Sequence, residues 1–455
     1  MTSTSASAEA RRSRTLHWVV GLSFAALLFD GYDLVVYGTV VPTLLADKSQ
    51  IGALTPEQAG TLGSWALIGV LVGALTAGAI GDLVGRRRIM LVNIAWFSVG
   101  MALTATTTSI FTFGAGRFLT GIGVGALVAT VGALVAEFAP ADRRNRYNAI
   151  VYSGIPAGGV CAALAAIVLD DVAGWRGLFW IGALPVLLLL PLAWAKLPES
   201  PLWLLSRGET ERAAAVSRRT GVALPAAGTV PATQATKADK VGYAALASRP
   251  YLVPTILLGL MSFSGLLLTY GLNTWLPQIM EGKGYGKDYA LAFLLLLNLG
   301  AIVGGLIASW VADRKGARRV VATTFLLAAV ALLLMPFDLP FTVLLAAVAV
   351  AGVGSIGTQV LIYGLVSNYY PTSARAAGVA WCAGFGRLGG IVGPVIGGIL
   401  VGAGVGGSTA FQLFAAVSVV GAVVTLCVRG VAGGRTSTAV TPDEEAAVAR
   451  DAVPA

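Results

Sequence analysis

The sequence predicts an all-α membrane protein with twelve transmembrane helices arranged as two six-helix bundles. The first observation behind this prediction is composition: of 455 residues, 56% are hydrophobic and only 12% are charged. Soluble domains carry about 25% charged residues. The net charge of +9 does not indicate a nucleic-acid partner, because the basic residues occur in short clusters between apolar runs.

The second observation is the number of apolar runs that are long enough to cross a bilayer, which takes about 20 residues. Twelve are expected, and the longest polar interval divides them six and six. We therefore expect a cytoplasmic N-terminal arm at 1–17, a first bundle at 18–196, a cytoplasmic central loop at 197–250, a second bundle at 251–429 and a cytoplasmic tail at 430–455. The twelve runs are 18–42, 58–80, 89–108, 110–134, 147–169, 177–196, 251–275, 289–311, 319–337, 340–363, 376–400 and 408–429.

The distribution of Lys and Arg predicts the orientation, since cytoplasmic loops are enriched in both. With the N-terminus inside, 25 of the 31 fall in inner segments, four in outer loops and two, Arg117 and Arg387, within helices. Both termini are therefore expected in the cytoplasm, and the chain in the bacterial inner membrane. No cleavable signal peptide is expected, because the first apolar run is too long.

The third observation is an internal repeat. Residues 78–88 read GAIGDLVGRRR and residues 309–319 read SWVADRKGARR, at the same place in each half. Duplicated halves with a binding site between them, near the middle of the membrane, are a recurrent plan of transporters.

At these motifs the chain resembles the major facilitator superfamily. The stretch 78–88 looks like that superfamily's helix 2–3 signature, and RFLTGIGVG at 117–125 looks like its helix 4 signature. FDGYDLVVYGTVVP at 29–42, NTWLP at 273–277 and GRLG at 386–389 resemble the aromatic acid:proton symporter family, and most of all its benzoate branch. The resemblance implies alternating access by rocking of the two halves.

The first helix holds two acids, Asp30 and Asp33, three residues apart and therefore on one face. A charge in the membrane centre costs roughly 2.5–3.5 kcal/mol on insertion scales. Two carboxylates so close in a low dielectric do not both ionise readily, so one is expected to hold a proton. We predict that this pair couples transport to protons. The alternative is a purely structural pairing with arginines.

Two arginines within helices are the expected counter-charges. Arg117 in helix 4 lies at a depth that matches Asp30, so we predict that it pairs with the helix 1 acids and takes part in proton coupling. Arg387 in helix 11 lies near the midplane, where a guanidinium would bind a carboxylate substrate bidentately. A static ion pair for Arg117 and a bracing role for Arg387 are the alternatives.

Polar and aromatic residues in the apolar runs are candidates for the rest of the substrate site, since aromatic rings stack on a planar substrate. They are Tyr37, Tyr270, Asn273, Trp275, Gln278, Asn298, Gln359 and Tyr363. The resemblance also implies a group of gating charges at the inner ends of the helices. These are Asp82, Arg86, Glu137, Arg143, Asp313 and Arg318.

No metal cluster and no phosphate-binding loop are visible in the sequence, so we expect no cofactor and no enzymatic activity. The leading hypothesis is a monomeric symporter that imports an aromatic carboxylate with protons. One alternative is a proton-driven exporter of small organic molecules, although Ile155 disrupts the helix 5 spacing typical of exporters. The other is a non-transporting membrane sensor, which would be expected to carry a signalling domain.

Overall fold

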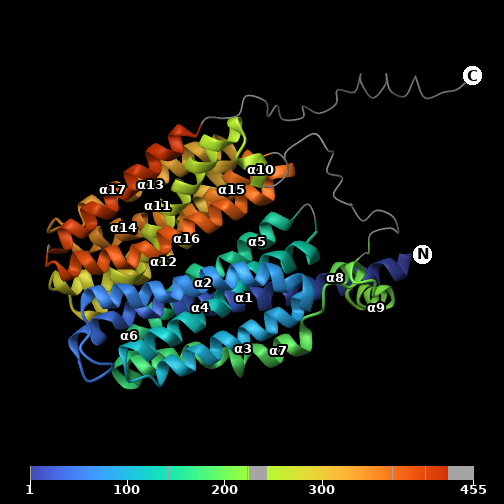
Figure 1. Ribbon diagram of the computed structural model, residues 1–455, viewed down its shortest axis with the longest axis horizontal. Helices are drawn as coiled ribbons and strands as arrows, with labels where there is room; N and C mark the ends of the chain where they lie inside the picture. The colour runs from blue at the N-terminus through green and yellow to red at the C-terminus, as the bar shows by residue number, and fades with distance from the viewer. Residues whose placement is uncertain are drawn as a thin grey trace, which may run out of the picture.

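The computed structural model describes residues 2–140, 143–222, 224, 243–370, 372–404 and 406–428, and these form helices joined by short turns (Figure 1). The first half contains α1 (Thr2–Ala46), α2 (Pro56–Val84), α3 (Arg86–Ala105), α4 (Ile110–Phe138), α5 (Arg144–Tyr152), α6 (Gly154–Ala183), η1 (Leu184–Val186) and α7 (Leu189–Lys196). The middle segment contains α8 (Pro201–Ser206), α9 (Thr210–Thr220) and α10 (Tyr243–Leu246). The second half contains α11 (Arg249–Gly282), α12 (Lys287–Lys315), α13 (Ala317–Leu334), α14 (Phe341–Gly352), η2 (Val353–Gly357), α15 (Thr358–Tyr369), α16 (Thr372–Gly402) and α17 (Gly406–Cys427).

Eleven helical stretches of the described chain are long and apolar enough to cross a membrane, and one of them, Arg146–Lys196, has 51 residues. At 1.5 Å per residue this stretch is more than twice the ~30 Å of a hydrocarbon core. It is interrupted at Gly174, where φ is 61° and the chain leaves the helical region. Two crossings therefore lie within it, and the total is the expected twelve.

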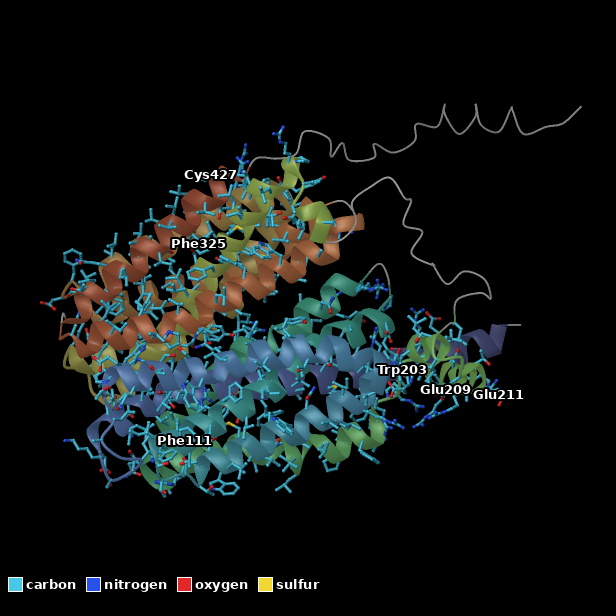
Figure 2. All side chains as sticks on the ribbon, viewed as in Figure 1. Phe111, Trp203, Glu209, Glu211, Phe325 and Cys427 are labelled. Atoms are coloured by element: carbon cyan, nitrogen blue, oxygen red, sulfur yellow. The ribbon has the colours of Figure 1, made fainter. Side chains whose placement is uncertain are left out.

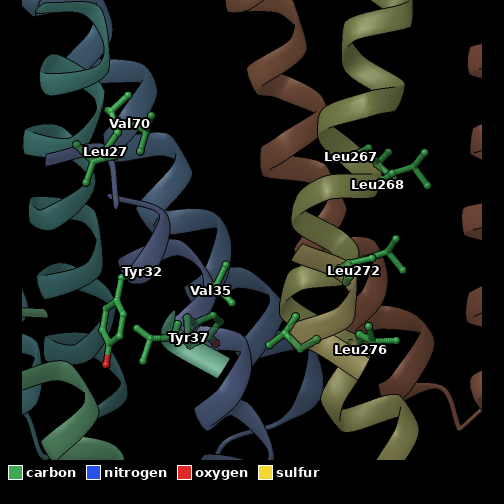
Figure 3. Packing of buried hydrophobic residues seen from close by; sticks show 14 of the residues in the cluster. Leu27, Tyr32, Val35, Tyr37, Val70, Leu267, Leu268, Leu272 and Leu276 are labelled. Carbon is green, nitrogen blue, oxygen red and sulfur yellow. The ribbon is translucent and has the colours of Figure 1, made fainter. Parts of the chain in front are cut away.

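The twelve spans form two bundles, one from each half of the chain. In the first bundle α1 packs on α6, and α4 packs on α2 and α3; in the second α11 packs on α16, and α13 on α17. Leu267, Leu268 and Leu272 of α11 belong to the same buried apolar cluster as Leu27 and Val35 of α1 (Figure 3). The core is therefore continuous across the interface between the halves.

The bundles meet at one end and diverge at the other (Figure 1). We call the end where α1 begins, near α8 and α9, the terminal face, and the other end the opposite face. The halves touch through α1–α11, α2–α16 and α6–α12. Near the opposite face, Ser64 Oγ of α2 donates a hydrogen bond of 2.5 Å to the Ile391 carbonyl of α16. The opposite face is closed.

Helices α8 and α9 of the middle segment lie at the terminal face beside the first half, where Figure 2 labels Trp203 on α8, Glu209 just before α9 and Glu211 on α9. Helix α10 packs instead on α16 and α11 of the second half. Glu199 Oε1, just before α8, accepts a hydrogen bond of 3.0 Å from the backbone N–H of Arg87 at the start of α3. The expected arm at 1–17 continues α1 as helix from Thr2. The part of the expected central loop that follows α9 lies largely outside the described residues, as does the tail at 430–455.

Candidate functional site

The two acids of the first helix sit where α1 crosses α6 at very short distance. Gly31, between the acids, lies directly against the backbone of Ile155, and Gly158 lies against the Leu28 carbonyl. A side chain at either glycine would overlap backbone atoms of the neighbouring helix. Small residues allow such backbone contact between transmembrane helices. This crossing holds Asp30 and Asp33 at a fixed position in the first half.

Asp33 forms a buried ion pair with Arg117, as expected for the counter-charge on helix 4. The exposed fractions of the two side chains are 0% and 2%. Arg117 Nη1 also donates to the Asp33 carbonyl at 3.2 Å. The guanidinium lies over the ring of Tyr37, 5.1 Å from its centroid. Asp33 thus has its charge compensated within the first half.

Asp30 has a different environment. It is 1% exposed, and its Oδ1 has no hydrogen-bond partner within the described part of the chain. The charged groups that act on it are Arg387, on α16 of the other half, and Asp33. Asp30 is therefore an acid of the first half within electrostatic reach of a cation of the second.

Arg387 is half-buried, and the described residues provide it with neither an ion pair nor a hydrogen bond. Tyr152, Tyr270 and Tyr363 lie within its electrostatic reach. Tyr152 belongs to the first half, and the other two belong to the second. Arg387, Asp30 and these three tyrosines, which we call the central cluster, thus lie at the interface of the two halves.

Amides lie beside the central cluster. Asn298 Nδ2 donates to Asn273 Oδ1 at 2.9 Å, linking α12 to α11. Gln359 Nε2 donates to Ser262 Oγ at 2.9 Å, while its Oε1 is buried without a partner among the described residues. A cavity of about 30 Å³ is lined by Gly31, Tyr270, Asn273 and Asn298, among others. It has room for a water molecule or two, but not for an aromatic ring.

The family model of the Major Facilitator Superfamily matches residues 23–314 and 292–451, which is most of the chain. The chain belongs to the major facilitator superfamily. The gentisate transporter of Corynebacterium glutamicum is 34% identical over 393 residues, which cover 85% of this chain and 82% of that protein. The benzoate transport protein of Acinetobacter baylyi is 33% identical over 404 residues, covering 85% of this chain and 84% of that protein.

Solved structures of the superfamily share the fold. A crystal structure of a D-xylose–proton symporter aligns with a TM-score of 0.71 over 92% of this chain and 99% of that one. The sequence identity of this alignment is 18%, so the likeness concerns the fold alone.

Two residues expected in the substrate site lie elsewhere in this superfamily member. Tyr37 is 1% exposed, and its hydroxyl donates to the Ala59 carbonyl at 2.5 Å, so it joins α1 to α2 (Figure 3). Trp275 is fully buried, and its Nε1 donates to the Pro394 carbonyl at 2.7 Å, joining α11 to α16. Their polar atoms are engaged in helix packing and are not available to a ligand.

Three of the expected gating charges, at the terminal face, have partners within their own halves. Arg86 forms an ion pair with Glu137, and Arg318 Nη1 donates to the Val428 carbonyl at 2.8 Å. Arg143 and Asp313 are exposed. The side chain of Asp82 lies outside the described part of the structure.

Our interpretation of the sequence missed two features. Tyr152 was not among the candidates, since a single tyrosine near a helix end resembles an interfacial residue. At the opposite face Lys287 of α12 forms ion pairs with Asp170 and Asp171 of α6, across the two halves. Lys287 is one of the four basic residues expected in outer loops, and only spatial proximity reveals its partners.

Proposed function

We propose that this chain imports an aromatic carboxylate, benzoate or a hydroxybenzoate, together with protons by alternating access. The observation that carries the proposal is Arg387, an arginine without an ion pair among the described residues, which lies within electrostatic reach of Asp30 of the other half. Gentisate and benzoate, the substrates named for two relatives, both place a carboxylate on an aromatic ring.

Arg387 binds the substrate carboxylate in this proposal, because its planar fork matches two carboxylate oxygens. Tyr270 and Tyr363 contact the ring, and Gln359, Asn273 and Asn298 supply polar contacts around it. Tyr37 and Trp275 are left out of the site, since their polar atoms already bind backbone carbonyls.

Asp30 is the proton carrier in this proposal. Unlike Asp33, it has no cation within ion-pair distance among the described residues, so a proton is its available partner. When a substrate carboxylate neutralises Arg387, the nearby positive charge no longer favours the ionised form of Asp30, so the protonated form is favoured. The ion pair between Asp33 and Arg117 holds the first helix in place. It also transmits the change in the charge state of Asp30 along that helix.

The terminal face is cytoplasmic in this proposal, so both termini lie inside and the structure faces inward. The excess of Lys and Arg in segments at that face supports the orientation. The protein is a monomer in the bacterial inner membrane in this proposal. Its two halves, 18–196 and 251–429, rock against each other. The charges Asp82, Arg86, Glu137, Arg143, Asp313 and Arg318 rearrange when the terminal face closes.

Counterflow in proteoliposomes tests the proposal. Vesicles preloaded with unlabelled benzoate should take up labelled benzoate from outside, and an inward proton gradient should drive net accumulation from empty vesicles. A protonophore should abolish accumulation but leave counterflow. Accumulation that persists with the protonophore would exclude proton coupling, and absence of counterflow with any benzoate derivative would exclude this substrate class.

A further inference from the structure

A groove of about 760 Å³ runs between α12 and α13 at the terminal face, away from the central cluster. One wall is formed by Ile307, Ala308 and Val311 of α12, and the other by Leu327 of α13. Val353, the first residue of the π-helical segment η2, also lines it. The groove belongs entirely to the second half and has no role in the proposed transport site.

The apolar walls of this groove face outward. Ile307 is 58% exposed and Leu327 is 47% exposed, and Trp310 next to the groove is 57% exposed. Such large exposed apolar side chains on spanning helices contact the lipid bilayer. We therefore expect the acyl chain of a lipid to lie along these apolar walls.

The end of the groove at the terminal face is cationic. Arg314 and Lys315 in the last turn of α12 and Arg319 at the start of α13 all line it, and all three are exposed. No acidic side chain of the described residues forms an ion pair with any of the three. Arg314 stacks on Trp310 with its guanidinium carbon 3.5 Å from the ring centroid, which holds it at the groove.

Two other charged groups near this end do not line the groove. Asp313 is the nearest acid in the sequence, but it is not among the residues that line the groove. Arg318 uses its guanidinium to bind the Val428 carbonyl at 2.8 Å, on the side of α17. Three cations thus converge where the hydrocarbon region ends.

We propose that this groove binds one anionic phospholipid, with its phosphodiester on Arg314, Lys315 and Arg319 and an acyl chain along Ile307 and Leu327. Guanidinium groups pair with phosphate through two parallel hydrogen bonds. Basic pockets between transmembrane helices on the cytoplasmic side suit anionic head groups. A zwitterionic lipid would bring its own cation to the same three charges and bind less well.

Native mass spectrometry of the purified protein tests this site independently of transport. Phosphatidylglycerol and phosphatidylcholine with identical acyl chains are added in turn, and the retained lipid is counted. The wild type should retain one phosphatidylglycerol in preference to phosphatidylcholine. Substitution of Arg314, Lys315 and Arg319 by Gln should lower this preference about fivefold for each cation removed.

A matched control removes three exposed cations of the same face that do not line the groove. Arg207, Arg218 and Arg219 of the middle segment, changed together to Gln, should leave the preference unchanged. Ala308→Trp, which fills the groove, should reduce retention of both lipids. Thermal unfolding of each variant checks folding.

Three results would overturn the proposal. Equal loss of phosphatidylglycerol in the groove variant and the control variant would mean that the lipid only responds to the overall positive charge. Retention that Ala308→Trp leaves intact would mean that the lipid binds elsewhere. A dimer that excludes lipid from α12 and α13 would also overturn it, since the groove would then be a contact between two copies.

Discussion

Asp30 and Asp33 are three residues apart on one helix, yet they have different partners. Asp33 is paired with Arg117 inside the first half, whereas Asp30 has no ion pair among the described residues and lies within electrostatic reach of Arg387 of the second half. An acid whose negative charge is compensated by an arginine stays ionised more readily, so it is less suited to exchange a proton during transport. In the proposed mechanism this difference gives Asp33 a structural and transmitting role and Asp30 the role of proton carrier.

Asp30→Asn should separate binding from coupling. The variant keeps the size of the side chain but carries no exchangeable charge, so counterflow should persist while accumulation driven by a proton gradient is lost. Asp33→Asn should instead lower the melting temperature, since a buried Arg117 without its counter-charge costs about 3–5 kcal/mol. Wild-type accumulation in Asp30→Asn would refute the role of Asp30.

Arg387→Lys should weaken substrate binding although the charge is kept. A lysine offers a point charge where the guanidinium offers a planar fork. Loss of one hydrogen bond to a charged group costs about 1.5–3 kcal/mol, so affinity for benzoate should fall about tenfold or more. A scintillation proximity assay measures this, with Arg117→Lys as the control that should retain affinity. Unchanged affinity in Arg387→Lys, with reduced affinity in Arg117→Lys, would reverse the two roles.

At the scale of helices, the close contact of α1 with α6 depends on glycine, beside a hydrogen bond from the Tyr32 hydroxyl to the Leu178 carbonyl at 2.8 Å. Gly158 lies against the backbone of α1 at Leu28 and Gly31. This contact fixes the height and rotation of the acids relative to Arg117. The same closeness occurs across the halves, where Gly38 of α1 lies against the Asn273 carbonyl of α11.

Gly158→Val should therefore destabilise the protein by about 1–3 kcal/mol, because the added methyl groups overlap backbone atoms that cannot turn away. A lower melting temperature in detergent measures the effect. Gly21→Val is the matched control on α1, since nothing lies within 4 Å of a side chain built at Gly21. Equal melting temperatures of the two variants would show that α1 and α6 separate at little cost.

At the scale of the whole molecule, the closed opposite face is held partly by charge. Lys287 of the second half pairs with Asp170 and Asp171 of the first, and the side chain of Asp170 is only 6% exposed. These ion pairs must break when the opposite face opens, so they favour the state with the terminal face open.

Lys287→Gln should shift the population toward the state that is open at the opposite face, by roughly fivefold for an interaction of about 1 kcal/mol. Distances between spin labels at Thr108 and Asp338, on loops of the two halves, measure the shift in a cysteine-free background. Lys283→Gln is the control, since Lys283 Nζ binds the Met335 carbonyl at 2.6 Å within its own half. An unchanged distance distribution in Lys287→Gln would mean that packing alone closes this face.

The sequence alone was sufficient to predict the twelve spans, the two halves and the superfamily, because apolar runs and repeated loop motifs are properties of contiguous residues. It also located the acids and arginines within the spans, since any charge stands out in an apolar run. The depth of Arg117 in its helix was enough to make it a candidate partner of the helix 1 acids.

Only the tertiary structure decided which acid pairs with which arginine. Helix periodicity tells which residues share a face, but the rotation and tilt of each helix determine what that face meets. For this reason Arg117 pairs with Asp33, Arg387 lies within electrostatic reach of Asp30, and Tyr37 and Trp275 lie in packed helix interfaces. Lys287 and Asp170 lie in separate halves, and their pairing exists only because the two bundles close together at the opposite face.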